Sequence, residues 1–251
     1  MDMFYEDYGV GRPLILLHGG TSTSQTWQPF VPILMPHFRV ITPDSRAHGQ
    51  SNNPAGVLSY RLMADDIAAF IQTLNLVQPF VFGYSDGGQI ALELGMHYPT
   101  IPGALVIGAA WYKFSTVYLN AMKSAGFESP GGVNIKRIQT ESPEWVEEMK
   151  RDHISSGDTD YWQTLLKQIS AMWWTALDYT RKDFEKIVAP SLVLLGDRDG
   201  IIELQQAVDM YQFIPDAELF IIPNADHFTA QSEISMRIAV EFLLRHNQLP
   251  E

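Results

Sequence analysis

The chain of 251 residues is predicted to be an α/β protein with a mostly parallel central sheet and helices on both faces. Two observations support this fold class. Short runs rich in Val, Ile, Leu and Phe recur along the chain, and they are nearly continuously apolar, as strands covered on both faces are. Amphipathic stretches lie between most of these runs, so that strand and helix alternate.

The predicted sheet contains one edge strand and six buried strands. Residues 3–8 are expected to form the edge strand at the start of the chain. The buried strands are assigned to the apolar runs LILL (14–17), FRVIT (38–42), FVFGY (80–84), ALVIG (104–108), LVLLG (192–196) and LFII (219–222).

Four amphipathic stretches are predicted as the helices that cover this sheet. In the first of them Ile67, Phe70 and Ile71 recur at the spacing of one helical face, while Asp65 and Asp66 fall elsewhere on the helix. The four stretches span residues 61–74, 89–98, 203–213 and 232–245.

The alternation of strands and helices stops once, between residues 109 and 191. About 80 residues separate these positions without another convincing buried strand, which is far longer than an ordinary connection. The sequence therefore predicts an inserted helical cap of residues 111–182 on a core of residues 1–110 and 183–251.

Tryptophan is concentrated in the predicted cap. Five of the six tryptophans lie there, namely Trp111, Trp145, Trp162, Trp173 and Trp174. Because indole is costly to leave in water, these side chains either pack a small core within the cap or line a cavity beneath it. Packing is the expected role for any single one, and Trp111 and Trp173 are the predicted substrate contacts.

The composition argues against several classes of function. A formal net charge of −12 without a Lys/Arg cluster repels nucleic acids and anionic lipids. No stretch approaches the roughly 20 apolar residues of a membrane span, and the opening MDMFYEDYGVG lacks the features of a signal peptide. We therefore expect a cytoplasmic protein that binds neither nucleic acid nor membrane. The absence of cysteine leaves its chemistry to oxygen and nitrogen groups.

A serine stands between glycines where a buried strand passes into a helix. Residues 83–87, GYSDG, match the pattern G-x-S-x-G at this position. A sharp turn strains the backbone of Ser85 and brings neighbouring chains close, so glycine is needed on either side. The helix that follows directs unpaired N–H groups and the positive end of its dipole to the same place, where an anion would be stabilised.

This turn is identified as the nucleophile elbow of the α/β-hydrolases, and the resemblance to that superfamily covers nearly the whole chain. Residues 16–21, LLHGGT, resemble the loop whose backbone N–H completes an oxyanion hole. The match implies Gly20 as one donor and the Asp86 N–H as the second, with Thr21 as a weaker substitute. Residues 44–51, DSRAHGQS, resemble the D-x-R-G-x-G-x-S loop, with alanine where a glycine is usual.

A serine hydroxyl is a weak nucleophile alone, so a base and a group that orients the base are required. His227 follows the last predicted strand, where the superfamily places its catalytic histidine. The other six histidines are assigned to structural positions: His18 and His48 to loops, and His37, His97, His153 and His246 to the surface or to helix ends.

The orienting acid is chosen from two aspartates in the segment LLGDRDGII. The family pattern G-x-x-D selects Asp199, and no acid follows the strand at 104–108, the other location that the family uses. Asp197 is then expected to bond the loop backbone. The chain order Ser85, Asp199, His227 is that of the α/β-hydrolases.

The resemblance implies a serine hydrolase that cleaves a small-molecule carboxylic ester or a related acyl substrate. His227 would take the proton of Ser85 as its oxygen attacks the acyl carbon, Gly20 and Asp86 N–H groups would hold the oxyanion, and Asp199 would fix the imidazole. No metal or organic cofactor is expected.

The side chain of Asp86 supports two interpretations. An acid in the first turn of a helix is favoured by the macrodipole, by roughly 0.3–1 kcal/mol. The sequence GYSDGG also resembles the elbow of valacyclovir-hydrolase-like proteins that cleave α-amino-acid esters, which implies that the carboxylate binds a substrate ammonium.

Other activities of the superfamily remain open. Carbon–carbon bond hydrolases, perhydrolases and acyltransferases share the serine machinery, and a ligand receptor that turns over slowly is a non-enzymatic alternative. Epoxide hydrolases and haloalkane dehalogenases use a carboxylate nucleophile, so Ser85 counts against both.

Overall fold

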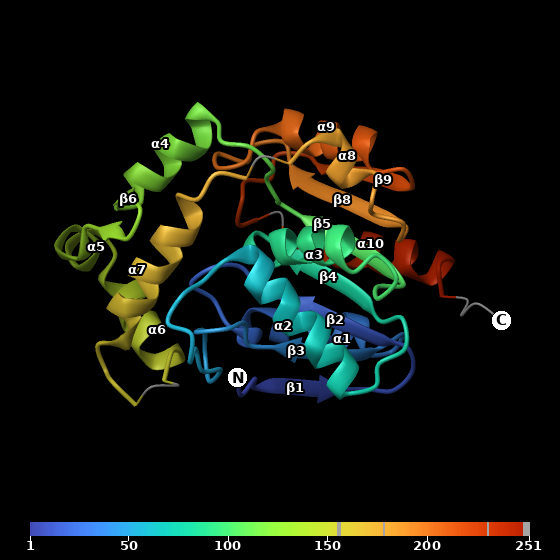
Figure 1. Ribbon diagram of the computed structural model, residues 1–251, viewed down its shortest axis with the longest axis horizontal. Coiled ribbons are helices and arrows are strands. Elements are labelled where there is room, and N and C mark those ends of the chain that lie inside the picture. The colour runs from blue at the N-terminus through green and yellow to red at the C-terminus, as the bar shows by residue number, and fades with distance from the viewer. Residues whose placement is uncertain (155–156, 178, 230, 248–251) are drawn as a thin grey trace.

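A computed structural model describes residues 1–154, 157–177, 179–229 and 231–247 of the chain (Figure 1). Its centre is a sheet of seven strands, which are β1 (Tyr5–Tyr8), β2 (Pro13–Leu17), β3 (Arg39–Pro43), β4 (Phe80–Tyr84), β5 (Ala104–Gly108), β8 (Ser191–Gly196) and β9 (Ala217–Ile222). Their order is β1-β3-β2-β4-β5-β8-β9. Strand β1 pairs antiparallel with β3, and the other pairs are parallel. The predicted edge strand and the six other predicted strands are found within two residues of their predicted bounds. The expectation that all six are buried is wrong for β9, which forms the opposite edge of the sheet and buries only Ile222.

Helices cover both faces of this sheet. They are the 3-10 helix η1 (Ser24–Phe30), α1 (Val31–Leu34), α2 (Tyr60–Thr73), α3 (Asp86–His97), α8 (Arg181–Phe184), α9 (Leu204–Phe213) and α10 (Glu233–Arg245). Helix α2 packs against α3, and α1 against α10. The crossover from β2 to β3, which contains α1, runs along the sheet in the opposite direction to the later crossovers, which contain α2, α3 and α9. Because such crossovers are right-handed, α1 lies on one face and α2, α3 and α9 on the other. Helix α10 packs against α1 and so lies on the face of α1.

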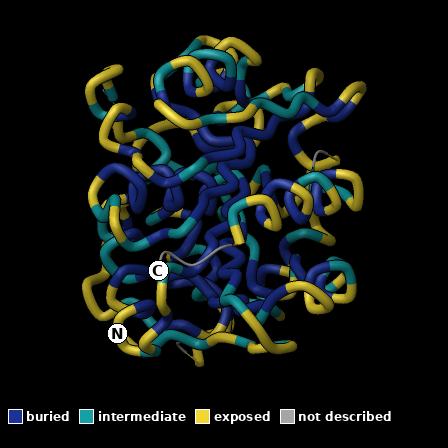
Figure 2. The backbone as a smooth tube through the Cα atoms, turned by 90° about the vertical axis from the view of Figure 1, so that its right-hand side faces the viewer, coloured by how far each residue is buried: buried dark blue, intermediate teal, exposed yellow. Residues whose placement is uncertain are grey.

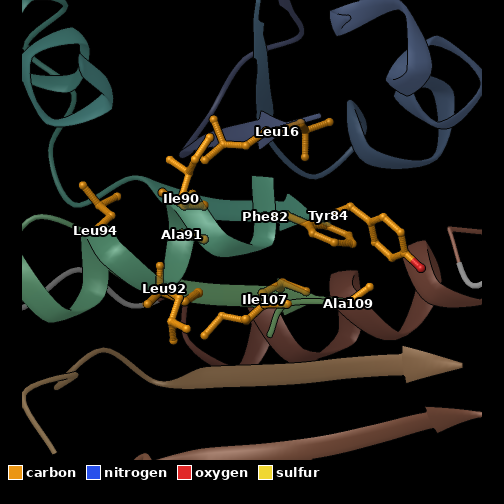
Figure 3. Packing of buried hydrophobic residues seen from close by; sticks show 14 of the residues in the cluster. Leu16, Phe82, Tyr84, Ile90, Ala91, Leu92, Leu94, Ile107 and Ala109 are labelled. Atoms are coloured by element: carbon orange, nitrogen blue, oxygen red, sulfur yellow. The ribbon is translucent and has the colours of Figure 1, made fainter. Parts of the chain in front are cut away.

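The core consists of the strands and the helix faces that touch them. Buried residues, dark blue in Figure 2, run through the middle of the molecule, and they include every residue of β4, β5 and β8. Figure 3 shows Ile90 and Leu92 of α3 among the side chains of β2, β4 and β5. Helix α3 begins at Asp86, three residues before the predicted start at Gln89, because the turn at Ser85 leads directly into it.

Most of the long segment between β5 and β8 lies to one side of the sheet, on the left in Figure 1, whereas its last helix, α8, packs against α9. The part on the left contains α4 (Thr116–Ser124), β6 (Phe127–Ser129), β7 (Gly132–Val133), α5 (Ile135–Glu141), α6 (Pro143–Asp152) and α7 (Tyr161–Trp173). Strands β6 and β7 form a short hairpin that the sequence does not predict, because neither contains an apolar run. The division into a core and a cap of residues 111–182 stays a prediction.

Among the helices of the described ranges, none has both the length and the apolarity that a bilayer crossing requires. The cytoplasmic location stays a prediction.

Candidate active site

Ser85 lies in a strained turn between β4 and α3. Its backbone has φ 55° and ψ −118°, a positive φ of the kind that costs a non-glycine residue of order 1–3 kcal/mol. A Cβ atom at Gly83 would clash with the carbonyl of Gly87, and one at Gly87 would clash with the carbonyl of Leu17. The glycines beside the serine therefore have the steric role that the sequence predicts.

The side chains of Ser85, His227 and Asp199 form a continuous chain of hydrogen bonds. The distance from His227 Nε2 to Ser85 Oγ is 3.0 Å, and that from His227 Nδ1 to Asp199 Oδ2 is 2.8 Å. A neutral imidazole that donates its Nδ1–H to the carboxylate presents Nε2 as the acceptor for the serine hydroxyl. The structure thus brings together the three residues that the sequence selects.

Asp199 is fixed by its own loop. Its Oδ1 accepts hydrogen bonds from the amides of Ile201 and Ile202, both at 2.8 Å. Asp197 instead lies at the surface, with Arg198 Nε 3.9 Å from its carboxylate. The expectation that the Asp197 side chain bonds the loop backbone is wrong for the described residues, since the turn directs Asp199 rather than Asp197 toward those amides.

The backbone N–H groups of Gly20 and Asp86 lie beside Ser85 and have no acceptor within the described part of the chain. Both residues line the same cavity as Ser85. The Thr21 N–H, in contrast, donates to His48 Nε2 at 3.3 Å. Gly20 and Asp86 therefore present the N–H groups that are available to an anion, and Thr21 does not.

The carboxylate of Asp86 is buried in the same place. The indole N–H of Trp173 donates to both of its oxygens at 2.9 Å, and the hydroxyl of Tyr60 donates to Oδ1 at 2.8 Å. Burial raises the pKa of Asp86 to about 6, and the hydrogen bonds from Trp173 and Tyr60 oppose that rise. A Cβ atom at Gly20 would clash with this carboxylate, so glycine is required there.

An apolar cavity of about 360 Å³ opens in front of Ser85. Most of its wall comes from the segment between β5 and β8 and from the loops after β8 and β9. The apolar lining residues are Ala109, Trp111, Tyr118, Met122, Ala125, Phe127, Ile138, Trp145, Trp173, Ile201, Ile202 and Phe228. Of the described residues in its wall, none is Lys or Arg, and Asp86 is the only carboxylate.

The tryptophans of the segment between β5 and β8 divide between the two expected roles. Trp111, Trp145 and Trp173 line the cavity. Trp111 and Trp173 are the two tryptophans predicted to contact the substrate. Trp162 is fully buried in packing, and Trp174 donates its indole N–H to the Phe127 carbonyl at 3.2 Å.

A second, more polar cavity of about 630 Å³ meets the first one at Ser85 and His227. Its wall combines the loop at residues 19–23 and η1 with α6. The polar lining residues include Thr21, Ser22, Thr23, Gln25, Thr26, Glu148, Arg151, Asp152 and Gln231. The candidate nucleophile therefore lies where an apolar and a polar compartment join.

Three supporting residues were not found from the sequence. The hydroxyl of Tyr84 donates to the carbonyl of His227 at 2.8 Å and holds that loop. Tyr60 bonds Asp86, and His153 is buried beside the loop of Gly20 rather than simply ending a helix. Within the described ranges, no three His, Cys, Asp or Glu side chains gather as metal ligands.

A match to a protein-family model shows which family the chain belongs to. The family model described as the alpha/beta hydrolase fold matches residues 12–230. The chain belongs to the α/β-hydrolase-fold family. The resemblance of the chain to the α/β-hydrolase superfamily is thereby confirmed.

The proteins to which the chain is similar have different names. The chain is 36% identical to the magnesium-chelatase 30 kDa subunit of Rhodobacter capsulatus, over 83% of this chain and 78% of that protein. It is 25% identical to a 2-hydroxy-6-oxo-2,4-heptadienoate hydrolase of Pseudomonas putida, over 94% and 91%. The structure of a thermophilic esterase from Thermogutta terrifontis matches with a TM-score of 0.74 and 25% identity, over 98% of this chain and 94% of that one.

Proposed function

We propose that the protein is a serine hydrolase that cleaves carboxylic esters through an acyl-enzyme. The observation that carries this proposal is the hydrogen-bonded chain Ser85–His227–Asp199 next to two N–H groups without acceptors. Each part of the arrangement matches one requirement of acyl transfer, namely a nucleophile, a base, a group that orients the base and donors for an oxyanion.

The proposed reaction has two halves. His227 takes the hydroxyl proton as Ser85 Oγ attacks the acyl carbon, and the amides of Gly20 and Asp86 hold the oxyanion. His227 then protonates the leaving alcohol, and an acyl-enzyme forms. In the second half His227 activates water, which releases the acid and regenerates the serine. Asp199 keeps the imidazole in the required tautomer and stabilises its protonated form.

The charge of the apolar cavity favours an ester with an uncharged acyl group. The heptadienoate cleaved by the Pseudomonas putida relative is a carboxylate. A carboxylate in this cavity would meet Asp86 and no Lys or Arg among the described lining residues. Since an unpaired buried charge is costly, this lining disfavours the keto acids that such carbon–carbon bond hydrolases use.

Residues 111–182 are proposed to act as the cap over this site. Trp111, Trp145 and Trp173 contribute the aromatic wall of the apolar cavity. The polar cavity on the other side of Ser85 leads us to propose a small-molecule ester that joins an apolar group to a more polar one. The net charge of −12 supports the absence of a nucleic-acid or membrane partner.

A second candidate is an α-amino-acid ester. It is favoured by the buried carboxylate of Asp86, which lines the cavity beside Ser85 without a cationic partner in that wall. A substrate ammonium would supply the missing positive charge. An aminoacyl ester should then be cleaved faster than its deaminated analogue, whereas equal rates for the pair would remove this candidate.

The experiment is a panel of neutral acyl esters, the matching amides, aminoacyl esters and an anionic keto acid, assayed with the native chain and with Ser85→Ala. Fast hydrolysis of neutral esters that Ser85→Ala abolishes supports the proposal. Preferred cleavage of the keto acid would favour the carbon–carbon bond hydrolase instead. A single burst of acylation followed by little turnover would indicate a ligand receptor.

A further inference from the structure

Three buried histidines lie in a row behind the loop that carries Gly20. The ring centroids of His18 and His48 are 5.1 Å apart, and those of His48 and His153 are 5.7 Å apart. All three side chains are buried. His18 and His48 belong to the loops after β2 and β3, whereas His153 ends α6 in the segment between β5 and β8.

Each histidine holds a different peptide group of this loop. His18 Nδ1 lies 2.7 Å from the Gly19 carbonyl oxygen. His48 Nε2 accepts the N–H of Thr21 at 3.3 Å. His153 Nε2 lies 3.2 Å from the Thr21 carbonyl oxygen. Three consecutive peptide groups, from Gly19 to Ser22, are thus fixed one after another.

The remaining ring nitrogens determine the tautomers. Backbone N–H groups of Ser45 and Gly49 donate to His18 Nε2 and His153 Nδ1, at 2.9 and 2.8 Å. Those nitrogens must therefore be acceptors, so His18 and His153 donate their other N–H to the carbonyls of Gly19 and Thr21. Burial lowers the pKa of His153 to about 4, so the neutral form persists at neutral pH.

This arrangement determines where the Gly20 N–H points. A trans peptide places its C=O and N–H on opposite sides, so fixing the Gly19 carbonyl also fixes the N–H of Gly20. Thr21 has a positive φ of 62°, a conformation that a non-glycine residue holds only when its neighbours enforce it. His48 and His153 provide that restraint from both sides of Thr21.

His153 is the only member of the three contributed by the segment between β5 and β8. The next residue, Ile154, also attaches the end of α6 to the core, because its N–H donates to the Gly49 carbonyl at 3.1 Å. The end of α6 is therefore joined to the loop at Gly49 and to the loop at Thr21 at once.

We propose that His153 is a positioning residue of the esterase site: through the Thr21 carbonyl, it holds the loop that directs the Gly20 N–H at the substrate oxyanion. This inference rests on the proposed function. It implies that the segment between β5 and β8 helps to build the oxyanion hole in addition to enclosing the substrate.

The test compares His153→Gln, His153→Asn and His153→Ala on a neutral ester. Gln can place an amide N–H near the position of Nε2 and should keep the bond to Thr21, whereas Asn can replace only the Nδ1 acceptor for Gly49. Asn and Ala are expected to lower kcat at least about tenfold, part of the 10²–10³ lost with a whole oxyanion donor, with KM within about twofold. Gln should stay near the native kcat.

A second measurement separates positioning from mere support of the fold. Sulfur accepts hydrogen bonds more weakly than oxygen, so the rate ratio between an ester and its thionoester reports on the oxyanion hole. This ratio should fall in His153→Asn and stay native in His153→Gln. His37→Gln, at an exposed position, is the matched control.

The outcomes distinguish this inference from the proposed function. If Ser85→Ala retains hydrolysis, the proposed function fails, whatever the His153 variants do. If Ser85→Ala is inactive but His153→Asn keeps the native kcat and the native ester/thionoester ratio, positioning by His153 is wrong. Rescue by Asn and not by Gln would also overturn it, because the contact with Gly49 alone would then matter.

Discussion

The indole N–H of Trp173 donates to both carboxylate oxygens of Asp86, with N···O distances of 2.9 Å. Asp86 directly follows Ser85, and Trp173 is the last residue of α7. This contact joins the segment between β5 and β8 to the turn that carries the candidate nucleophile. Together with the bond from His153 to Thr21, it connects that segment to both sides of the site.

Replacing Trp173 by Phe should destabilise the fold. The buried Asp86 carboxylate would lose a donor, and a hydrogen bond to a charged group contributes about 1.5–3 kcal/mol. Urea unfolding at pH 7 measures the loss. Trp174→Phe is the control, because that indole donates to the neutral carbonyl of Phe127. A loss in Trp173→Phe no larger than in Trp174→Phe would contradict the importance of the contact.

The charge of Asp86 should make stability depend on pH in a defined direction. Its pKa in the folded chain is raised from 3.8 to about 6, so its favourable contribution is present below pH 3.8 and is lost as pH rises through 6. The free energy of unfolding of the native chain, relative to Asp86→Asn, should therefore fall by roughly 2–3 kcal/mol between pH 4 and 7. A difference that is constant across this range would refute the raised pKa.

His153 should have the opposite dependence. Burial lowers its pKa from 6.5 to about 4 in the folded chain, so its contribution to stability is complete above pH 6.5 and is lost as pH falls toward 4. Relative to His153→Gln, the native chain should lose roughly 3 kcal/mol between pH 7 and 4. Denaturant unfolding of both chains across this range measures the loss, with His37→Gln as the histidine control. No relative loss on acidification would show that His153 is not buried in a neutral form.

Asp199 and Asp197 offer a matched pair for the proposed mechanism. Asp199→Asn should lower kcat by roughly 10⁴-fold, because the imidazole loses the acceptor that fixes its tautomer. Asp197→Asn should leave kcat unchanged, since the Asp197 side chain does not reach His227. Steady-state kinetics on one neutral ester compare the two, and a large loss in Asp197→Asn alone would reverse the assignment.

Much of the fold could be predicted because its signals are local. Apolar runs such as those at 80–84 and 104–108 are buried on both faces, so composition alone indicates strands there. The elbow is similarly local, because the glycines, Ser85 and the helix start all lie within a few residues. The choice of His227 rests on its place after the last predicted strand. The choice of Asp199 also needs the family pattern G-x-x-D, because Asp197 follows the same strand.

The supporting contacts could not be predicted because they join residues far apart in the sequence. His153 meets Gly49 across 104 positions, and Tyr60 meets Asp86 across 26. A lone histidine at a helix end has no local pattern that distinguishes a surface position from a buried one. The backbone conformation of Ala47 was not predicted either. Ala47 adopts a positive φ of 68° at the position where the family usually has glycine.

The most direct test of the central claim is the mass of the intact protein after rapid quenching of its reaction with a neutral ester that deacylates slowly. We expect a mass increase equal to one acyl group, located on the peptide that contains Ser85 and absent in Ser85→Ala. Acylation at another residue, or hydrolysis by Ser85→Ala at the native rate, would contradict it.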